Sequence, residues 1–155
     1  MYRNAIKRCL DIILSALGLV LLSWLFLIII IAIKIDSDGP VLFKQKRIGK
    51  NKHHQIDYFQ ILKFRTMRID TPSDVPTHMM SNPECYITKV GKFLRKTSLD
   101  ELPQIVNILV GKMSVIGPRP ALWNQNDLYM EREKYGVNEL RPGLTGWAQI
   151  NGRDE

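Results

Sequence analysis

The 155-residue sequence has few of the residue types that mark disulfide-stabilised, zinc-binding or nucleic-acid-binding proteins. Its two cysteines, Cys9 and Cys85, have neither zinc-site spacing nor the density of a disulfide framework, so we expect reduced thiols that serve as packing residues. Aromatic residues make up only 8% and do not alternate with the basic clusters, which argues against nucleic acid as a partner. The sequence also lacks a phosphate-binding P-loop, a dinucleotide fingerprint and a His-Glu metalloprotease motif.

Acidic residues are the scarcer charged type, with 15 Asp and Glu against 22 Lys and Arg and a net charge of +7. This balance favours anionic partners such as phosphorylated substrates or anionic lipids, without choosing between them. The length suits one small domain, which buries a limited share of its surface and would gain from a second support.

Residues 12–33 carry no charged side chain and are almost entirely apolar. As a helix this stretch would be roughly 33 Å long, about the thickness of a bilayer core. No small-residue cleavage site follows it, so we expect the segment to be retained in a membrane rather than removed as a signal peptide.

Basic residues flank the apolar stretch on both sides, and each flank is predicted to stay on the cytoplasmic face. A helix that enters one leaflet and turns back satisfies both flanks, whereas a straight span satisfies only one. The sequence favours the re-entrant arrangement and leaves the plain span as the alternative.

The remaining residues predict a small, mostly helical domain with one hairpin. Residues 41–48 and 56–64 read as its two strands, joined by a turn at 49–52. Helices are expected over 88–96, 99–109 and 127–135, with loops over 70–83 and 141–155. All three histidines, His53, His54 and His78, fall in the turn or a loop and are read as surface residues.

An acidic pair, Asp100 and Glu101, lies at the expected start of the 99–109 helix. Ser98 and Glu101 have capping-box spacing, so one interpretation is that the acids only begin a helix. A catalytic role is compatible with this capping role, because a carboxylate in the first helical turn stays ionised. The free backbone amides of that turn can also bind a phosphate.

Arginines held between prolines or glycines form a second group of candidate residues. Arg119 lies in Gly-Pro-Arg-Pro, Arg141 begins Arg-Pro-Gly-Leu-Thr-Gly, and Lys63 and Arg65 open a third basic segment. Guanidinium groups bind phosphate with two hydrogen bonds, and a rigid backbone lowers the ordering cost. Each element alone is weak evidence, but three of them around an acidic pair suggest a diphosphate site.

Several ordered motifs resemble the monotopic phosphoglycosyl transferases, also called bacterial sugar transferases. They cover most of the chain: Lys7-Arg8-x-x-Asp11, Gly39-Pro40-Val41, Lys63-Phe64-Arg65-Thr66-Met67, Thr97-Ser98-Leu99-Asp100-Glu101-Leu102-Pro103-Gln104, Met113-Ser114-Val115-Ile116-Gly117-Pro118-Arg119-Pro120 and Arg141-Pro142-Gly143-Leu144-Thr145-Gly146-Trp147-Ala148-Gln149.

The resemblance implies an α+β fold, with a re-entrant membrane helix at 1–36 and a cytosolic catalytic domain at 37–155. It implies an enzyme on the cytoplasmic face of the bacterial inner membrane that takes a UDP-sugar and undecaprenyl phosphate. Asp100 would attack the β-phosphate, release UMP and carry the phospho-sugar until the lipid accepts it. Mg²⁺ would bind near Asp100, and Glu101 would support the site. The expected substrate-binding residues are Lys63, Arg65, Arg95, Arg119 and Arg141.

The sequence departs from the family in three places that matter. The hairpin region, Asn51 to Tyr58, is a few residues longer than usual. Trp24 follows Ser23 where the family usually has proline, which removes the strongest helix-bending device. Related proteins normally continue with further helix beyond the position of Glu155, so we expect a C-terminally truncated chain. An inactive truncated member, or a membrane-anchored basic module that binds anionic lipid, is the alternative, and a homodimer is a possible assembly.

Overall fold

The computed structural model describes residues 2–51, 55–71 and 82–152, and its mixture of helices and short strands confirms the α+β class. The three histidines lie outside these ranges. The elements are α1 (Tyr2–Leu21), α2 (Ser23–Asp36), β1 (Leu42–Ile48), β2 (Tyr58–Phe64), η2 (Pro83–Tyr86), α3 (Lys89–Thr97), η3 (Leu99–Glu101), α4 (Gln104–Leu109), β3 (Ser114–Ile116), α5 (Asn126–Lys134), η4 (Val137–Glu139), β4 (Gly143–Thr145) and α6 (Trp147–Asn151), where η denotes a 3₁₀ helix.

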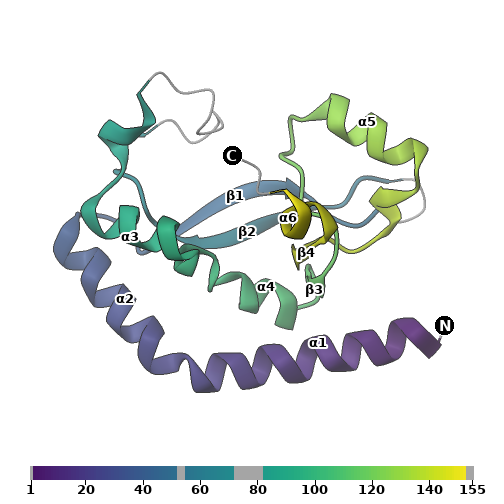
Figure 1. Cartoon of the computed structure of the whole chain (residues 1–155), viewed down its shortest axis with the longest axis horizontal. Helices are drawn as coiled ribbons and strands as arrows, with labels where there is room; N and C mark the ends of the chain where they lie inside the picture. The colour runs from purple at the N-terminus through teal and green to yellow at the C-terminus, as the bar shows by residue number, and fades with distance from the viewer. Residues whose placement is uncertain (1, 52–54, 72–81, 153–155) are drawn as a thin grey trace.

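The predicted hairpin is confirmed: β1 and β2 pair antiparallel from Leu42 opposite Phe64 to Ile48 opposite Tyr58. It crosses the middle of the molecule, with α4 between it and α1 (Figure 1). Phe59 and Ile61 pack with Ile108 of α4 in one of the two apolar clusters. Asn107 of α4 also bonds the backbone of β2, accepting from Leu62 N at 2.9 Å and donating to Gln60 O at 2.9 Å. The hairpin is thereby fixed to the helix that follows the acidic pair.

The apolar segment forms two helices, α1 and α2, which run along one edge of the molecule and meet at a 61° bend (Figure 1). Within the described ranges no single helix is long and apolar enough to cross a membrane, whereas Ala5–Leu21 and Ser23–Asp36 together meet that test by length and composition. The bend occurs without proline. The Ser23 hydroxyl donates to the Val20 carbonyl at 2.8 Å, a back-bond that favours helix bending.

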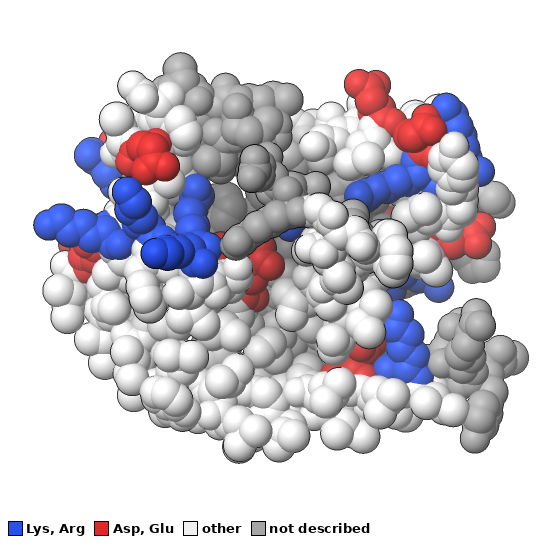
Figure 2. All heavy atoms as spheres, in the orientation of Figure 1, with Lys and Arg blue, Asp and Glu red and all other residues white. Residues whose placement is uncertain are grey.

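Helix α1 buries two polar side chains and exposes many of its apolar ones. Asp11 and Ser15 are buried, whereas Leu17, Val20 and Leu21 are 52–71% exposed. Away from the N-terminal end, the edge formed by α1 and α2 shows almost no charged atoms on the face seen in Figure 2. A continuous exposed apolar surface of this kind marks a site that contacts a membrane or a protein.

The Lys7-Arg8-x-x-Asp11 motif attaches α1 to the rest of the fold. Arg8 donates to the Ile108 and Leu109 carbonyls at the end of α4, at 2.6 and 2.7 Å. Asp11 accepts from the Ser114 hydroxyl at 3.1 Å and from Val115 N at 2.9 Å. These contacts explain why charged side chains lie at the start of an otherwise apolar helix.

Residues 141–155 do not form the single loop expected from the sequence, because they include β4 and α6. Strand β4 pairs in parallel with β3, with Ser114 opposite Gly143 and Ile116 opposite Thr145. These two segments of the backbone approach each other so closely that a Cβ on Gly117 would lie 2.3 Å from the Arg141 carbonyl oxygen. A Cβ on Gly143 would lie 2.1 Å from Gly117 N. Glycine is therefore required by backbone contact at both positions.

The expectation that the two cysteines are packing residues is also wrong, since Cys9 and Cys85 are exposed free thiols.

Candidate active site

An open hollow of about 1640 Å³ lies above the hairpin and brings together most of the residues expected to form the site. It exceeds the roughly 300–1,000 Å³ of common small-molecule pockets, so it has room for a large polar substrate. Among the expected residues, its lining includes Lys63, Arg65, Arg95, Asp100, Glu101 and Arg119. Arg47 and Gln149 also line the hollow, and the sequence analysis did not predict them as site residues.

A tight backbone reversal at Ser98 places the acidic pair in the hollow. Ser98 ends α3 in the left-handed conformation, with φ 58°, and the next three residues form the short helix η3. The capping-box interpretation is wrong, because the Ser98 side chain makes no capping bond to this turn. Asp100 and Glu101 lie in a single 3₁₀ turn rather than at the start of a long α-helix. The expected helix-dipole stabilisation therefore does not apply to them.

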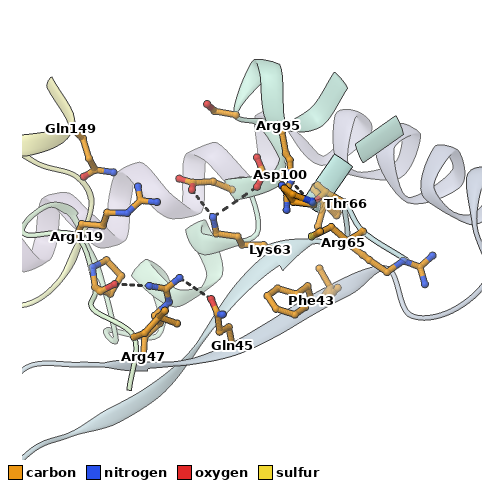
Figure 3. Close-up of a pocket in the computed structure, with 18 of the residues that line it drawn as sticks. Phe43, Gln45, Arg47, Lys63, Arg65, Thr66, Arg95, Asp100, Arg119 and Gln149 are labelled. Atoms are coloured by element: carbon orange, nitrogen blue, oxygen red, sulfur yellow. Dashed lines mark hydrogen bonds and ion pairs between the residues drawn. The ribbon is translucent and has the colours of Figure 1, made fainter. Parts of the chain in front are cut away.

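Lys63 of β2 lies between the two carboxylates (Figure 3). Its Nζ is 2.6 Å from Glu101 Oε1 and 3.8 Å from Asp100 Oδ2. Asp100 is buried, with 9% of its surface exposed, whereas Glu101 is half-buried. The two acids thus have different surroundings, and Lys63 pairs more closely with Glu101.

Burial raises the pKa of Asp100 above its usual range, because ionisation costs more away from water. Lys63 opposes this rise, the negative charge of Glu101 adds to it, and Arg95 also opposes it. The result is a carboxylate that is poorly stabilised in its charged form. Such a group is a good candidate for chemistry, because perturbed pKa values cluster at functional sites.

Arg95 reaches the hollow from α3, which packs directly on the backbone of Thr66. A Cβ on Gly91 of α3 would lie 2.0 Å from the Thr66 carbonyl oxygen, so only glycine permits this approach. Arg95 Nε then donates to Thr66 Oγ1 at 2.9 Å. Burial lowers the pKa of Arg95, and the nearby Asp100 opposes that change.

Two further arginines, Arg47 and Arg119, lie across the hollow from Arg95 (Figure 3). Arg119 comes from the Gly-Pro-Arg-Pro segment after β3, as expected. Arg47 comes from β1, where alternation places Phe43, Gln45 and Arg47 along the hollow. The predicted strand contained the signal for Arg47, but the alternation alone did not tell which face of the strand would meet the acids.

Two of the residues expected to bind substrate, Arg65 and Arg141, have other surroundings in the structure. The Arg65 guanidinium borders the hollow but donates to the Asp38 carbonyl at 2.5 Å and the Ser37 carbonyl at 2.6 Å, just after α2. Arg65 is also buried, so its visible contacts hold the end of α2 in place. Arg141 does not appear among the described residues that line the hollow and instead precedes β4.

Mg²⁺ typically keeps several waters and binds through one or two carboxylates together with substrate phosphates. Asp100 and Glu101 match this ligand type, so the residues fit the metal implied by the resemblance. Within the described ranges no group of three His, Cys, Asp or Glu could hold a metal by itself. A phosphate-bearing substrate would therefore have to supply part of the coordination.

The sequence model of the bacterial sugar transferase family matches residues 2–155. The chain belongs to this family. The Escherichia coli K12 UDP-glucose:undecaprenyl-phosphate glucose-1-phosphate transferase is 44% identical over 149 residues, which are 95% of this chain and 31% of that protein. The exopolysaccharide production protein ExoY of Sinorhizobium fredii is 37% identical over 163 residues, covering 96% of this chain and 70% of that protein.

A third relative, from Caulobacter vibrioides, bears the same name as the Escherichia coli protein. It is 44% identical over 150 residues, covering 94% of this chain and 54% of that relative. The chain thus spans about a third of the Escherichia coli relative and about half of the Caulobacter one. The bacterial sugar transferase family assignment covers the part of the chain that holds the hollow and its acidic pair.

Proposed function

We propose that this chain is a phosphoglycosyl transferase that moves a sugar phosphate from a UDP-sugar to undecaprenyl phosphate. The observation that carries the proposal is the buried Asp100 carboxylate in a hollow lined by Lys63, Arg95 and Arg119. Cations around a carboxylate allow an anionic diphosphate to approach it. The names of the Escherichia coli and Caulobacter relatives make UDP-glucose the first donor to test.

In the proposed first step, an oxygen of Asp100 attacks the β-phosphorus of the donor. The bond from this phosphorus to the bridging oxygen breaks, and UMP leaves with that oxygen and the electron pair. In the second step a phosphate oxygen of undecaprenyl phosphate attacks the same phosphorus, and Asp100 leaves as a carboxylate. Covalent catalysis allows the two bulky substrates to use one nucleophile in turn.

The other residues would handle charge during both steps. Lys63 would balance the acids before the substrate binds, and Arg95, held by Thr66, would bind the transferred phosphate from the α3 side. Mg²⁺, held by Asp100 with support from Glu101, would supply further positive charge to the diphosphate. Glu101 would keep Lys63 in position through their 2.6 Å ion pair.

The proposed location is the cytoplasmic face of the bacterial inner membrane, with α1 and α2 inserted as a re-entrant pair. The exposed apolar side chains of α1 and the 61° bend support this arrangement. Single cysteines replacing Ala5 and Asp38, in a background without Cys9 and Cys85, test it. Both should react with an impermeant maleimide from the cytoplasmic side only, and labelling of the two positions from opposite sides would contradict re-entry.

The activity test uses detergent-solubilised full chain with UDP-glucose, other UDP-sugars, Mg²⁺ and undecaprenyl phosphate. The parent should release UMP and form a sugar-phosphate adduct on the protein, whereas Asp100→Asn should do neither. Asp127→Asn removes an exposed carboxylate from α5 and serves as the matched control, with parental activity expected. Release that survives in Asp100→Asn would rule out the covalent mechanism. With undecaprenyl phosphate left out, so that the adduct is not consumed, absence of the adduct from the parent would also rule out the covalent mechanism.

A further inference from the structure

Strand β2 has one edge paired with β1, and its other edge meets helix α4 instead of a further strand. The side chain of Asn107 covers this second edge. Its Oδ1 accepts from Leu62 N at 2.9 Å, and its Nδ2 donates to Gln60 O at 2.9 Å. The side-chain amide thus takes the place that the peptide groups of a third strand would have.

The two Asn107 bonds fix a position that the apolar contacts leave free. Phe59 and Ile61 of β2 pack on Ile108 of α4, but apolar burial has no preferred direction and tolerates sliding. Hydrogen bonds weaken steeply when they are misaligned. Within the described ranges, no other side chain of α4 bonds the backbone of β2, so Asn107 sets the position of the strand along the helix.

The backbone of α4 around Asn107 is held from outside the hairpin. Asn107 is 5% exposed, and its carbonyl accepts from Lys112 N at 3.0 Å and from Met113 N at 3.1 Å. Arg8 of α1 donates to the carbonyls of the next two residues of α4. Asn107 is therefore a fixed point against which β2 is placed.

The charged groups of the site lie at the two ends of this connection. Lys63 follows Leu62 directly in β2. Asp100 and Asn107 belong to one run of helical turns, because η3 leads into α4 without an intervening loop. Lys63 Nζ is 3.8 Å from Asp100 Oδ2, close to the roughly 4 Å limit of an ion pair, so a small displacement of β2 along α4 would break this contact.

We propose that Asn107 is a positioning residue of the site, which sets where Lys63 lies between Asp100 and Glu101. Asn107 is not among the described residues that line the hollow, so it acts through the backbone of β2. Its effect on rate rests on the proposed function, in which Lys63 balances the two acids, whereas the placement of Lys63 does not. A misplacement of about 1 Å can cost about a hundredfold in rate.

UMP release from UDP-glucose by the full chain in detergent tests the effect on rate, with Asn107→Ala, Lys63→Gln and the double variant beside the parent. Asn107→Ala should lower kcat by about ten- to a hundredfold with little change in KM. In the Lys63→Gln background the same substitution should lower kcat by less than about twofold, because the side chain that Asn107 positions is already gone. Asn107→Asp keeps an acceptor for Leu62 N and should recover part of the lost kcat.

Asn138→Ala is the matched control for the loss of two buried hydrogen bonds. The Asn138 Nδ2 donates to Tyr129 O at 3.0 Å and to Glu133 Oε2 at 2.7 Å, and none of these residues lines the hollow. This variant should lose thermal stability and keep the parental kcat. If Asn107→Ala does not fold, Asn107→Asp replaces it in every comparison.

NMR of the Lys63 ammonium group tests its placement without turnover. The signal, assigned by its absence from Lys63→Gln, should shift in Asn107→Ala and stay unchanged in Asn138→Ala. An unshifted signal in the folded Asn107 variant would overturn the proposal. Losses in kcat that multiply with those of Lys63→Gln, or an equal loss in Asn138→Ala, would also overturn it.

Failure of the proposed function has a different signature. The parent would then release no UMP, or Asp100→Asn would release UMP as the parent does. The NMR signal would still report in either case whether Asn107 places Lys63.

Discussion

Replacing Asp11 with alanine should weaken the attachment of α1 to the rest of the fold. Asp11 is 4% exposed, and its Oδ1 accepts hydrogen bonds from both Val115 N and the Ser114 hydroxyl. Alanine leaves two buried donors without an acceptor, at roughly 1–3 kcal/mol for each. The hydroxyl can rotate toward another acceptor, so we expect a total loss of about 2–4 kcal/mol in the free energy of unfolding.

Urea unfolding in mild detergent, followed by circular dichroism, measures this loss. Asp11→Asn keeps a carbonyl oxygen at the same place and should lose less than half as much. Asp127→Ala removes an exposed carboxylate from α5 and should change stability by less than about 1 kcal/mol. If Asp11→Ala unfolds at the same urea concentration and with the same slope as the parent, the attachment of α1 through Asp11 is refuted.

Three further predictions concern the site. Gly91→Ala should destabilise the protein by roughly 1–3 kcal/mol, because its Cβ would meet the Thr66 carbonyl; urea unfolding equal to the parent would contradict this. Activity should fall as pH decreases through the raised pKa of Asp100. Because Lys63 lowers that pKa and Glu101 raises it, this fall in activity should occur at higher pH in Lys63→Gln and at lower pH in Glu101→Gln. Profiles of rate against pH test both directions. A carboxyl whose folded pKa is raised binds protons more tightly in the folded state, so its contribution to stability is lost as pH rises from about the ordinary value of 3.8 through the raised one. Asp100→Asn should therefore become more stable relative to the parent as pH rises through this window, as thermal unfolding over a pH series would show.

Local patterns sufficed to predict the hairpin and the approximate positions of two helices. Mixed apolar and polar residues on either side of a turn indicated the strands now seen as β1 and β2, and an amphipathic stretch indicated α3. The same reasoning misread Ser98. Its spacing to Glu101 fits a capping box, but Ser98 ends α3 in the left-handed conformation and only a 3₁₀ turn follows it.

Local sequence patterns could not predict the long-range pairing of β3 with β4. Strands β3 and β4 have three residues each, too few for a period of two to be recognised, and they pair across the intervening α5. For the site, motif resemblance located Asp100, Glu101, Arg95 and Arg119, which the structure brings to one hollow. It did not show that Arg65 bonds the carbonyls after α2, because that depends on where α2 ends in space.

Helix α4 sets the distance between Asp100, the proposed nucleophile, and helix α1, which is proposed to lie in the membrane. It has six residues and spans roughly 9 Å. The turn that holds Asp100 and Glu101 precedes α4, and Arg8 of α1 donates hydrogen bonds to the carbonyls at its other end. If α1 lies in the bilayer as proposed, the height of Asp100 above the headgroups is fixed by helix length and not by loop motion. Adding one residue to α4 would turn the acids by about 100° and shift them by about 1.5 Å, so the reach of the site is set in whole-residue steps.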